Sequence, residues 1–313
     1  MLKIFKTVSI VFVALGMLLG CGSSSDGSSP VVEEPPSTSI ELVDLSTLHT
    51  DVRETSGLAQ IGSRLYTHND SGGTATLYEV NATSGTVIRS ISVIGADNVD
   101  WEDLACDDTY LYIGDIGNND GSRSDLKIYK VLKDDINNLN AVNSEVISFS
   151  YADQVSFVPT PLSTPYDAEA LIVFEGKLYL FTKDWTAYKT KVYPIPTVPG
   201  NYMLTSTSEK VLEVLVTGAS IDTLNNSISL IGYSDPYDSS TAFKSMLLTL
   251  KNVASQDLFS ADIQAYEIEN PQEVGQVESV EFLSSSQLYI SAEGITIGST
   301  PYPAKLYQVE LGN

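Results

Sequence analysis

Short runs of alternating or continuous hydrophobic residues, separated by Gly, Asn, Asp and Ser turns, fill the chain after residue 40 and recur as five similar segments. Each segment contains two key apolar residues that open successive strand-like runs. The step between them is seven residues in four segments and eight in the fifth, which indicates an internal repeat. The five segments are Glu54–Asp70, Trp101–Asp115, Asp167–Lys183, Gly218–Tyr233 and Glu278–Glu293.

Every segment except the last is followed by two more strand-like runs bounded by turn residues, which predicts four strands per repeat. These further runs are Thr76–Val80 and Thr86–Val93, Leu126–Val131 and Glu145–Ser150, Lys191–Tyr193 and Lys210–Val216, Met246–Leu250 and Ile263–Ile268, and finally Ala304–Val309 alone. Helical periodicity is nearly absent, and Asp135–Val142 offers a turn or two at most.

Repeats of four strands predict an all-β fold, a β-propeller of four-stranded blades. The fifth repeat lacks its fourth strand, whereas an alternating run, Ile40–Leu45, precedes the first repeat. We expect this N-terminal strand to complete the last blade and close the ring, because closure removes open sheet edges. Five blades are the preferred count. Six blades are the alternative, since the second and fourth repeats are longer than the others.

The first twenty residues have the pattern of an export signal. Lys3 and Lys6 precede a nearly unbroken apolar run from Val8 to Leu19, which is too short for a stable membrane span. The run ends in the string LLGC at Cys21, which resembles the lipobox of bacterial lipoproteins. The resemblance implies cleavage before Cys21 and acylation of that cysteine, with palmitate as an expected acyl chain. An ordinary secretory signal with a chance cysteine is the alternative.

This interpretation divides the chain into a signal peptide (1–20), a disordered tether rich in Ser, Pro and Gly (21–39) and a propeller domain (40–313). The tether has too few apolar side chains to repay the entropy of ordering it. Several acyl chains would anchor the protein firmly in the cell envelope. Gly22 follows the cysteine, where Asp would be the alternative signal, so in an organism with two membranes the pattern resembles that of outer-membrane lipoproteins.

The formal charge of the chain is -23, and it becomes -25 in the mature protein because the signal peptide carries two lysines. So acidic a surface repels nucleic acid and anionic headgroups, and we expect membrane contact only through the lipid anchor. With Cys21 acylated, Cys106 is the one remaining cysteine, which predicts a fold without disulfides and an inert, buried thiol. We expect a monomer.

Four strings within the first three repeats form a recognisable set: His68–Gly73, Asp100–Ala105, Gly114–Asn119 and Asp167–Leu171. Together they resemble motifs of a group of secreted bacterial β-propellers that are loosely similar to phytase-like and SdiA-regulated propeller domains. The resemblance spans about residues 50–235 and implies a propeller. It implies no particular activity, because propellers host many unrelated functions.

The start of each first strand and the end of each second strand are expected on one face of a propeller, around one mouth of its central channel. Glu102, Glu169 and Glu278 stand at equivalent positions, two residues before the first key apolar residue of their repeats. Strand ends contribute further polar side chains: Asp70, Asp115 and Glu293, with Asn69 and Lys183 beside them. Carboxylates crowded into such a funnel repel one another unless a cation neutralises them or some are protonated.

Oxygen ligands favour a hard cation, which makes these acids candidate ligands of an axial Ca²⁺. The candidate metal ligands are Glu102, Glu169, Glu278, Asp70, Asp115 and Glu293. Likeness to gluconolactonase-type and phytase-type propellers implies the same ion. The alternative is that the acids cap turns and accept hydrogen bonds from backbone amides, with Lys183 pairing one of them.

Two classes of function follow from this pattern. One is a membrane-anchored surface or periplasmic module for binding or scaffolding, whose ligand is an unidentified polymer, protein or small molecule. The other is a metal-dependent hydrolase of a phosphate ester or lactone, which the single cation near the funnel, Lys183, disfavours for phosphate. A Ser–His–Asp site is disfavoured as well, because the chain has only two histidines.

Overall fold

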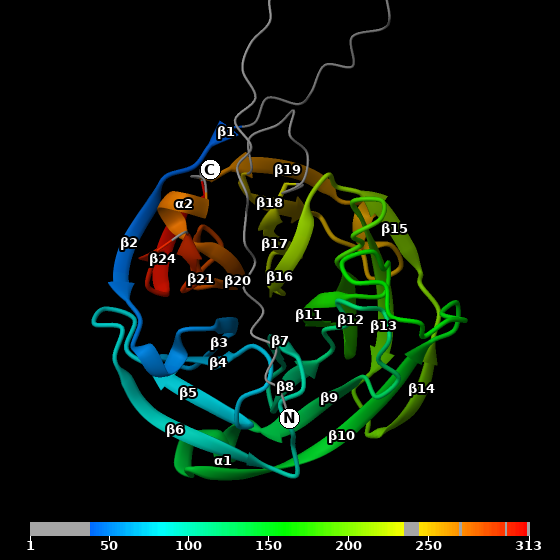
Figure 1. The fold of residues 1–313 in the computed structure, drawn as a ribbon, viewed down its shortest axis with the longest axis horizontal. Coiled ribbons are helices and arrows are strands. Elements are labelled where there is room, and N and C mark those ends of the chain that lie inside the picture. Colours follow the sequence, from blue (N-terminus) through cyan, green and yellow to red (C-terminus); the bar gives the residue numbers. More distant parts are fainter. Residues whose placement is uncertain (1–37, 235–243, 269–270, 298, 312–313) are drawn as a thin grey trace, which may run out of the picture.

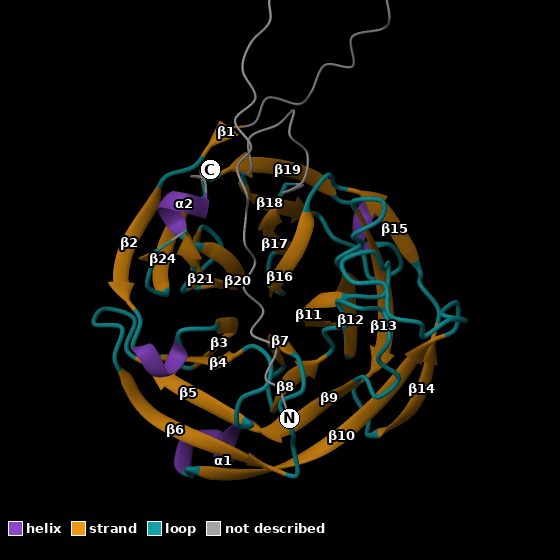
Figure 2. Ribbon diagram, viewed as in Figure 1, coloured by secondary structure: helices purple, strands orange, loops and turns teal. Residues whose placement is uncertain are grey.

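The structure, a computed structural model, describes residues 38–234, 244–268, 271–297 and 299–311. Its strands form five four-stranded blades arranged around a central axis, which is a five-bladed β-propeller (Figure 1). The inner strand of each blade contacts the inner strand of the next, and β20 of the last blade contacts β3 of the first. Figure 2 shows that helices are confined to short connections. The predicted all-β propeller with five blades is confirmed.

Each blade is an antiparallel sheet whose first strand lies at the axis and whose fourth strand lies at the rim. Blade 1 contains β3 (Thr55–Ile61), β4 (Arg64–Asn69), β5 (Thr76–Val80) and β6 (Val87–Ile94), and blade 2 contains β7 (Trp101–Cys106), β8 (Tyr110–Asp115), β9 (Lys127–Leu132) and β10 (Ala141–Tyr151). Blade 3 contains β11 (Ala168–Phe174), β12 (Lys177–Thr182), β13 (Lys189–Pro196) and β15 (Ser208–Val211).

Blade 4 contains β16 (Leu215–Asp222), β17 (Ser227–Tyr233), β18 (Ser245–Lys251) and β19 (Asp262–Glu267), and blade 5 contains β20 (Gln276–Phe282), β21 (Gln287–Glu293), β24 (Lys305–Glu310) and β2 (Leu42–Thr47). The remaining strands are β1 (Thr38–Ser39), β14 (Gly200–Leu204), β22 (Thr296–Ile297) and β23 (Thr300–Pro301). The helices are α1 (Lys133–Asn138), α2 (Pro271–Val274) and the 3-10 turns Thr50–Val52 and Leu258–Ser260. Among the described residues, no helix has the length and hydrophobicity needed to span a bilayer.

The ring is closed by the N-terminal strand. β2 pairs antiparallel with β24, with Leu42 opposite Val309 and Thr47 opposite Lys305, and so becomes the outer strand of blade 5. The predicted closing strand, Ile40–Leu45, therefore has the right partner and begins two residues too early. Just before it, β1 pairs in parallel with β19 of blade 4, so this N-terminal segment is hydrogen-bonded to two neighbouring blades.

The rim departs from the predicted strands in two places. The run Lys210–Val216 is split, because Glu213 has a positive φ of 56° and separates the outer strand β15 from the inner strand β16. The sequence analysis also missed β14, which leaves blade 3 and pairs in parallel with β10 of blade 2. A second parallel pairing, between β6 and β10, joins the rims of blades 1 and 2.

Hydrophobic side chains fill the wedges between successive blades. The described residues form five buried hydrophobic clusters, one for each pair of neighbouring blades. The cluster between blades 1 and 2, for example, contains the fully buried Tyr66 and Trp101. Near the axis the backbones approach so closely that a Cβ at Gly57 would lie 2.5 Å from the amide nitrogen of Leu104. Burial is therefore greatest between the blades and at the axis.

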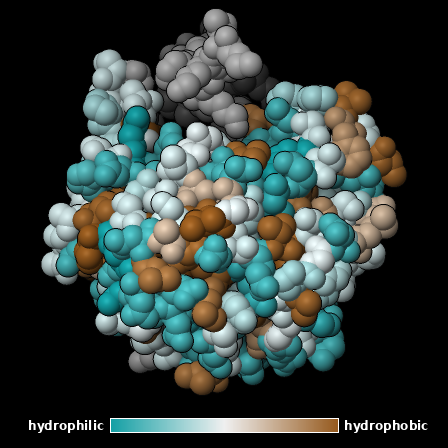
Figure 3. All heavy atoms as spheres, turned by 90° about the horizontal axis from the view of Figure 1, so that it is seen from below, coloured by the Kyte–Doolittle hydropathy of each residue, from teal (hydrophilic) through white to brown (hydrophobic). Residues whose placement is uncertain are grey.

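The outer edge of the disc is mixed in character. Figure 3 views the molecule from below Figure 1, onto the edge formed by β6 and β10, and shows hydrophobic residues dispersed among hydrophilic ones. Ile88 and Ile94 of β6 are more than half exposed, at 58% and 52%. The polar cluster that concerns function lies away from this edge, at the axis.

Candidate functional site

A β-bulge interrupts the inner strand of every blade close to its first residue. At this point the pairing with the second strand skips residues on the inner strand. The skipped residues are Ser56 with Gly57 in blade 1, Glu102 in blade 2, Glu169 in blade 3, Thr217 in blade 4 and Glu278 in blade 5. A bulge re-aims the side chain of the extra residue. The side chains of Glu102, Glu169 and Glu278 therefore depart from the regular alternation between the two faces of the sheet, at the same level along the axis.

The end of the second strand supplies the neighbouring positions. The residues that pair with the inner-strand residue just before the bulge are Asn69, Asp115, Thr182, Gly232 and Ala292. The residue after each of these is one position farther from the bulge, which gives the equivalent set Asp70, Ile116, Lys183, Tyr233 and Glu293. We call the axial group formed by Asp70, Asp100, Glu102, Glu169, Glu278, Glu293 and Lys183 the acidic mouth.

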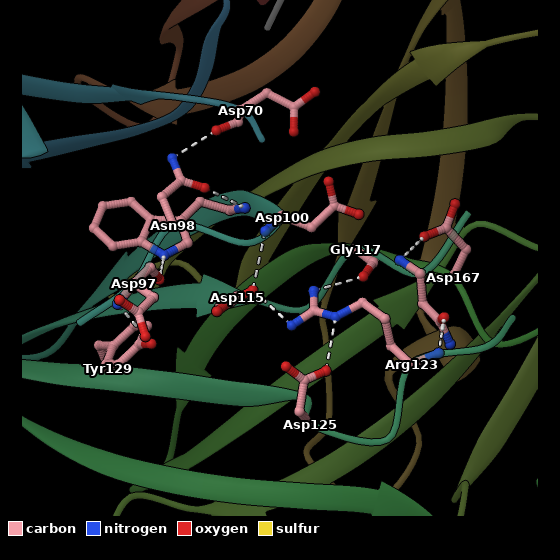
Figure 4. Close-up of polar contacts among 12 residues, drawn as sticks. Asp70, Asp97, Asn98, Asp100, Asp115, Gly117, Arg123, Asp125, Tyr129 and Asp167 are labelled. Atoms are coloured by element: carbon pink, nitrogen blue, oxygen red, sulfur yellow. Dashed lines mark hydrogen bonds and ion pairs between the residues drawn. The ribbon is translucent and has the colours of Figure 1, made fainter. Parts of the chain in front are cut away.

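Asp115 is the predicted ligand that the structure does not bring into the acidic mouth. It stands one register position before the residue equivalent to Asp70, and a shift of one residue along a strand reverses the side on which a side chain lies. Its Oδ1 accepts hydrogen bonds from the Asp100 amide at 3.1 Å and the Arg123 guanidinium at 2.8 Å (Figure 4). Asp115 is therefore already neutralised by Arg123.

Asn69 also has a local role. Its Nδ2 donates to the carbonyl of Asp51 at 2.7 Å, and its Oδ1 accepts from the amide of Glu54 at 3.2 Å. These bonds hold the segment that leads into β3. For Asn69 the structure thus favours the capping alternative, and the side chain adds no charge to the acidic mouth.

Asp70, Asp100 and Glu102 form the tightest group of acids. Each offers a carboxylate oxygen, and these three oxygens lie within 4.8 Å of one another. Asp100 belongs to the loop that precedes β7, and Asp70 follows β4 of the neighbouring blade, as Figure 4 shows. Glu102 is only 5% exposed. Within the described part of the chain, no hydrogen bond or ion pair reaches its carboxylate.

Gly117 makes room for this group. A Cβ built on Gly117 would lie 2.0 Å from Oε1 of Glu102 and 2.6 Å from Oδ2 of Asp100, so any larger residue would displace the carboxylates. Its amide donates to the carbonyl of Asp100 at 3.2 Å, and its own carbonyl accepts from Arg123 at 2.8 Å. The loop after β8 is thus fixed directly against the two acids.

Glu169 has a different environment. Its Oε2 accepts a hydrogen bond of 2.6 Å from Nζ of Lys183, and both side chains are 4% exposed. The ammonium also lies 4.8 Å from the ring centre of Trp185 and 5.0 Å from that of Tyr233. Glu278 of blade 5 also acts electrostatically on Lys183, and its carboxylate accepts a hydrogen bond from the side chain of Gln276. The lysine therefore sits in a buried cage of carboxylate and aromatic faces.

The titration of the acidic mouth reflects its burial. Burial first, and then the charges of Glu169, Asp70 and Asp100, raise the pKa of Glu102 well above its ordinary value. Burial and the neighbouring Glu293 do the same to the pKa of Glu278. Burial, then Asp70 and Glu54, raise the pKa of Glu293 to about 8.

Lys183 responds in the opposite sense to its burial. Burial alone would lower the pKa of its amine, but Glu169, Tyr233 and Glu278 raise that pKa well above the ordinary value. The amine is therefore protonated. Without a further positive charge, the acidic mouth holds protons that free carboxyl groups would release.

Sequence reasoning missed Asp100 and Gly117. Both lie within strings that carried the propeller resemblance, so their residue types were visible while their position beside Glu102 was not. Asp167, two residues before Glu169, is the equivalent of Asp100, but it accepts hydrogen bonds from the Asn118 amide at 2.6 Å and the Trp185 indole at 2.8 Å. Its carboxylate is thus already bonded on both oxygens.

The other end of the inner strands uses acids as structural ties. Asp103, fully buried, accepts hydrogen bonds from the amides of Leu104, Leu171 and Ala219. Glu281 accepts from the Gln60 amide at 2.9 Å and the Ser220 hydroxyl at 2.7 Å. Cys106 lies at the same end, half-buried and outside any disulfide, and its thiol donates to the carbonyl of Gln60 at 3.9 Å. Burial raises the pKa of this thiol to about 12, in agreement with an inert group.

Comparisons with known proteins agree with the fold. No protein-family model and no curated protein sequence matches the chain. Among solved structures, the chain is similar to the α-L-arabinanase of Penicillium chrysogenum complexed with arabinobiose, at 10% identity and a TM-score of 0.50, covering 87% of this chain and 98% of that one. This likeness supports the fold alone.

Two other solved structures are similar over comparable lengths. One is the PQQ-bound aldose sugar dehydrogenase of Streptomyces coelicolor, with 14% identity, a TM-score of 0.49 and coverage of 88% of this chain and 99% of that one. The other is the glutaminyl cyclase of Myxococcus xanthus, with 13% identity, a TM-score of 0.48 and coverage of 88% and 97%.

Proposed function

We propose that the acidic mouth binds one hard divalent cation, Ca²⁺, at Asp70, Asp100 and Glu102. The observation that carries this proposal is the state of Glu102. Glu102 is 5% exposed, and no hydrogen bond or ion pair from the described residues compensates its carboxylate. A buried carboxylate in that state either holds a proton or has a cation beside it.

The ligand chemistry supports a hard ion. The three closest donors are carboxylate oxygens within 4.8 Å of one another, and neither described histidine nor Cys106 belongs to the group. Oxygen-only sites suit Ca²⁺, which accepts flexible coordination and completes it with carbonyl groups and water. Gly117 supports the same view, because the space beside the two carboxylates exists only without a Cβ.

The function that this site supports best is that of a calcium-dependent binding module in the cell envelope. Loops from several blades surround the acidic mouth, and a cation held there would present a positive centre within an otherwise acidic surface. A ligand rich in oxygen atoms, whether a polymer, a protein or a small molecule, fits such a centre. Nucleic acid does not fit the net charge of -23.

Attachment to a membrane through acylated Cys21 is part of the same proposal. Cys21 and the expected signal peptide lie outside the described residues. The support is the lipobox-like sequence alone. Replacing Cys21 with Ser in the full chain and comparing membrane and soluble fractions tests it. Membrane association that survives the substitution would contradict the anchor.

Metal analysis tests the binding proposal directly. Elemental analysis of the purified protein should find about one calcium per chain after dialysis against micromolar Ca²⁺. Thermal melts should shift upward between EDTA and millimolar CaCl₂, because an ion that prefers the native state stabilises it. A melt indifferent to calcium, with no metal detected, would leave the acids as structural groups.

A metal-dependent hydrolase of a phosphate ester or lactone is the second candidate. The specific observation in its favour is that Glu278 and Glu293 lie in the same mouth as the candidate ligands, where they are within electrostatic reach of Asp70. A carboxyl group beside a metal can serve as acid or base in hydrolysis. Assays with chromogenic phosphate esters and lactones, with and without CaCl₂, distinguish the two candidates. Turnover that EDTA abolishes would favour the hydrolase.

A further inference from the structure

Lys183 occupies a position that carries an acid in two other blades. It follows Thr182, which pairs with Ala168 at the start of β11, as Asp70 follows Asn69 and Glu293 follows Ala292. The pseudosymmetry of the blades therefore places an ammonium group where a further carboxylate would otherwise stand.

The ammonium of Lys183 has the surroundings of a bound cation. Its Nζ lies 2.6 Å from Oε2 of Glu169 and is within electrostatic reach of Glu278. The ring faces of Trp185 and Tyr233, at 4.8 and 5.0 Å, favour a positive charge as well. The side chain is 4% exposed, so water contributes little to its solvation. The half of the acidic mouth that contains Glu169 and Glu278 thus holds one positive charge, the ammonium of Lys183.

The two halves of the mouth differ in one respect. Glu169 has a covalently tethered cation, whereas Glu102, at the equivalent bulge of the preceding blade, has none among the described residues. The tethered cation is present at every calcium concentration.

From this arrangement we infer that Lys183 is a built-in counter-ion that fills the second of two cation positions and limits the acidic mouth to a single divalent ion. This inference rests on the proposed function, since it assigns the first position to Ca²⁺. Lys183 accordingly determines how many metal ions bind. Its ammonium group donates to Glu169, which is not among the three proposed calcium ligands.

Replacing Lys183 with Met tests the inference, because Met keeps the length of the side chain and removes its charge. We expect calorimetric titration with CaCl₂ and elemental analysis to give about one ion per wild-type chain and about two per Lys183→Met chain. The metal-free variant should melt lower than the wild type and recover more on addition of calcium. The double variant Lys183→Met/Glu169→Gln, which removes both members of the pair, should return to one ion.

Lys189→Met is the matched control. Lys189 lies on β13 of the same blade and pairs with Glu209 at 3.0 Å on the exposed side, so its removal makes the same change in net charge outside the mouth. This control should bind one ion and melt like the wild type in both conditions.

The outcomes separate the inference from the proposed function. One ion in both the wild type and Lys183→Met would overturn the inference and keep the calcium site. Two ions in the wild type would also overturn the inference, and this outcome can be measured even if the Lys183→Met variant does not fold. No ion in the wild type and one in Lys183→Met would reject the calcium site and, with it, the inference of a second position beside a first. No ion in either protein would reject both.

Discussion

The carboxylate of Asp103 accepts a hydrogen bond of 2.8 Å from the amide of Leu171, which ties the inner strand of blade 2 to that of blade 3. The same oxygen, Oδ2, accepts a second bond of 3.1 Å from the amide of Ala219 in blade 4. One buried side chain thus joins three of the five inner strands. Backbone amides can only donate, so the bonded oxygens must act as acceptors.

Asp103→Asn should therefore destabilise the propeller. The oxygen of Asn can take the place of Oδ2 and keep the bonds from Leu171 and Ala219, but its NH₂ would then face the backbone N–H of Leu104 and leave that buried donor without a partner. We expect a loss of roughly 2–4 kcal/mol in the free energy of unfolding, measured by chemical denaturation. Asp108→Asn, at an exposed turn in the same blade, is the control and should change little. Equal stability of the two variants would show that the tie is unimportant.

Glu102→Gln should remove most of the stabilisation by calcium. The wild type should gain about 2.7 kcal/mol at a hundredfold excess of Ca²⁺ over the dissociation constant, and the variant only a small part of that. In EDTA the variant should be as stable as the wild type or more so, because it relieves repulsion among buried acids. Melts of both proteins in both conditions check this. Glu145→Gln, at an exposed position of β10, should behave like the wild type.

Gly117→Ala tests the space beside the carboxylates. The added Cβ would meet Oε1 of Glu102 at 2.0 Å and must displace it, so we expect calcium affinity to fall at least about tenfold, or about 1.4 kcal/mol. Gly73→Ala is the matched control, since its Cβ would meet only the Asn98 side chain, at 4.0 Å. Calcium titrations of the two variants that give the same affinity would contradict the assignment of the site.

The metal-free protein should become less stable as the pH rises. Burial raises the pKa of Glu293 from 4.5 to about 8 and that of Glu281 from 4.5 to about 7. Between pH 4.5 and about pH 8 the native state binds more protons than the unfolded state. The free energy of unfolding is therefore highest near pH 4.5 and falls as the pH rises toward 8. Denaturation in EDTA at about pH 5.5 and about pH 8.5 should reveal this slope. Glu293→Gln should flatten it, and a wild-type stability that increases with pH would refute the explanation.

Loss of the closing strand should cost more than loss of the residues before it. A chain that begins at residue 48 lacks β2 and exposes the edge of β24, whereas one that begins at residue 38 keeps the whole pairing. We expect the shorter chain to lose several kcal/mol, on the order of 3 or more, because blade 5 then has an unpaired edge and loses packing. Identical unfolding curves for the two truncations would mean that β2 does not stabilise the ring.

The sequence predicted the strands well because each repeat buries the same apolar positions. Leu58, Leu104 and Leu171 recur at fixed distances from the next strand, and the structure places all three in buried inner strands. The rim was harder to predict. Its strands β14 and β15 depend on pairing between blades and on the positive φ of Glu213, neither of which leaves a periodic signal.

The candidate site was predictable to the level of the blade but not of the single residue. Repeat alignment identified Glu102, Glu169 and Glu278 as equivalent, and the bulges confirm that equivalence. It could not show that Asp115 lies one register position too early to join them. Nor could it separate Glu169 from Glu102, because the difference is the hydrogen bond that Lys183, at the end of the neighbouring strand, donates to Glu169.

The N-terminal segment also has a mechanical consequence. A pull on the chain before Thr38, along the direction of the strands, is transmitted first to β1 and then to β2. The hydrogen bonds to β19 and β24 would then be loaded in shear and resist together, instead of parting one after another as in a zipper. Two adjacent blades share the load at the joint where the ring is closed. If that joint yields, the disc can open into a linear series of blades.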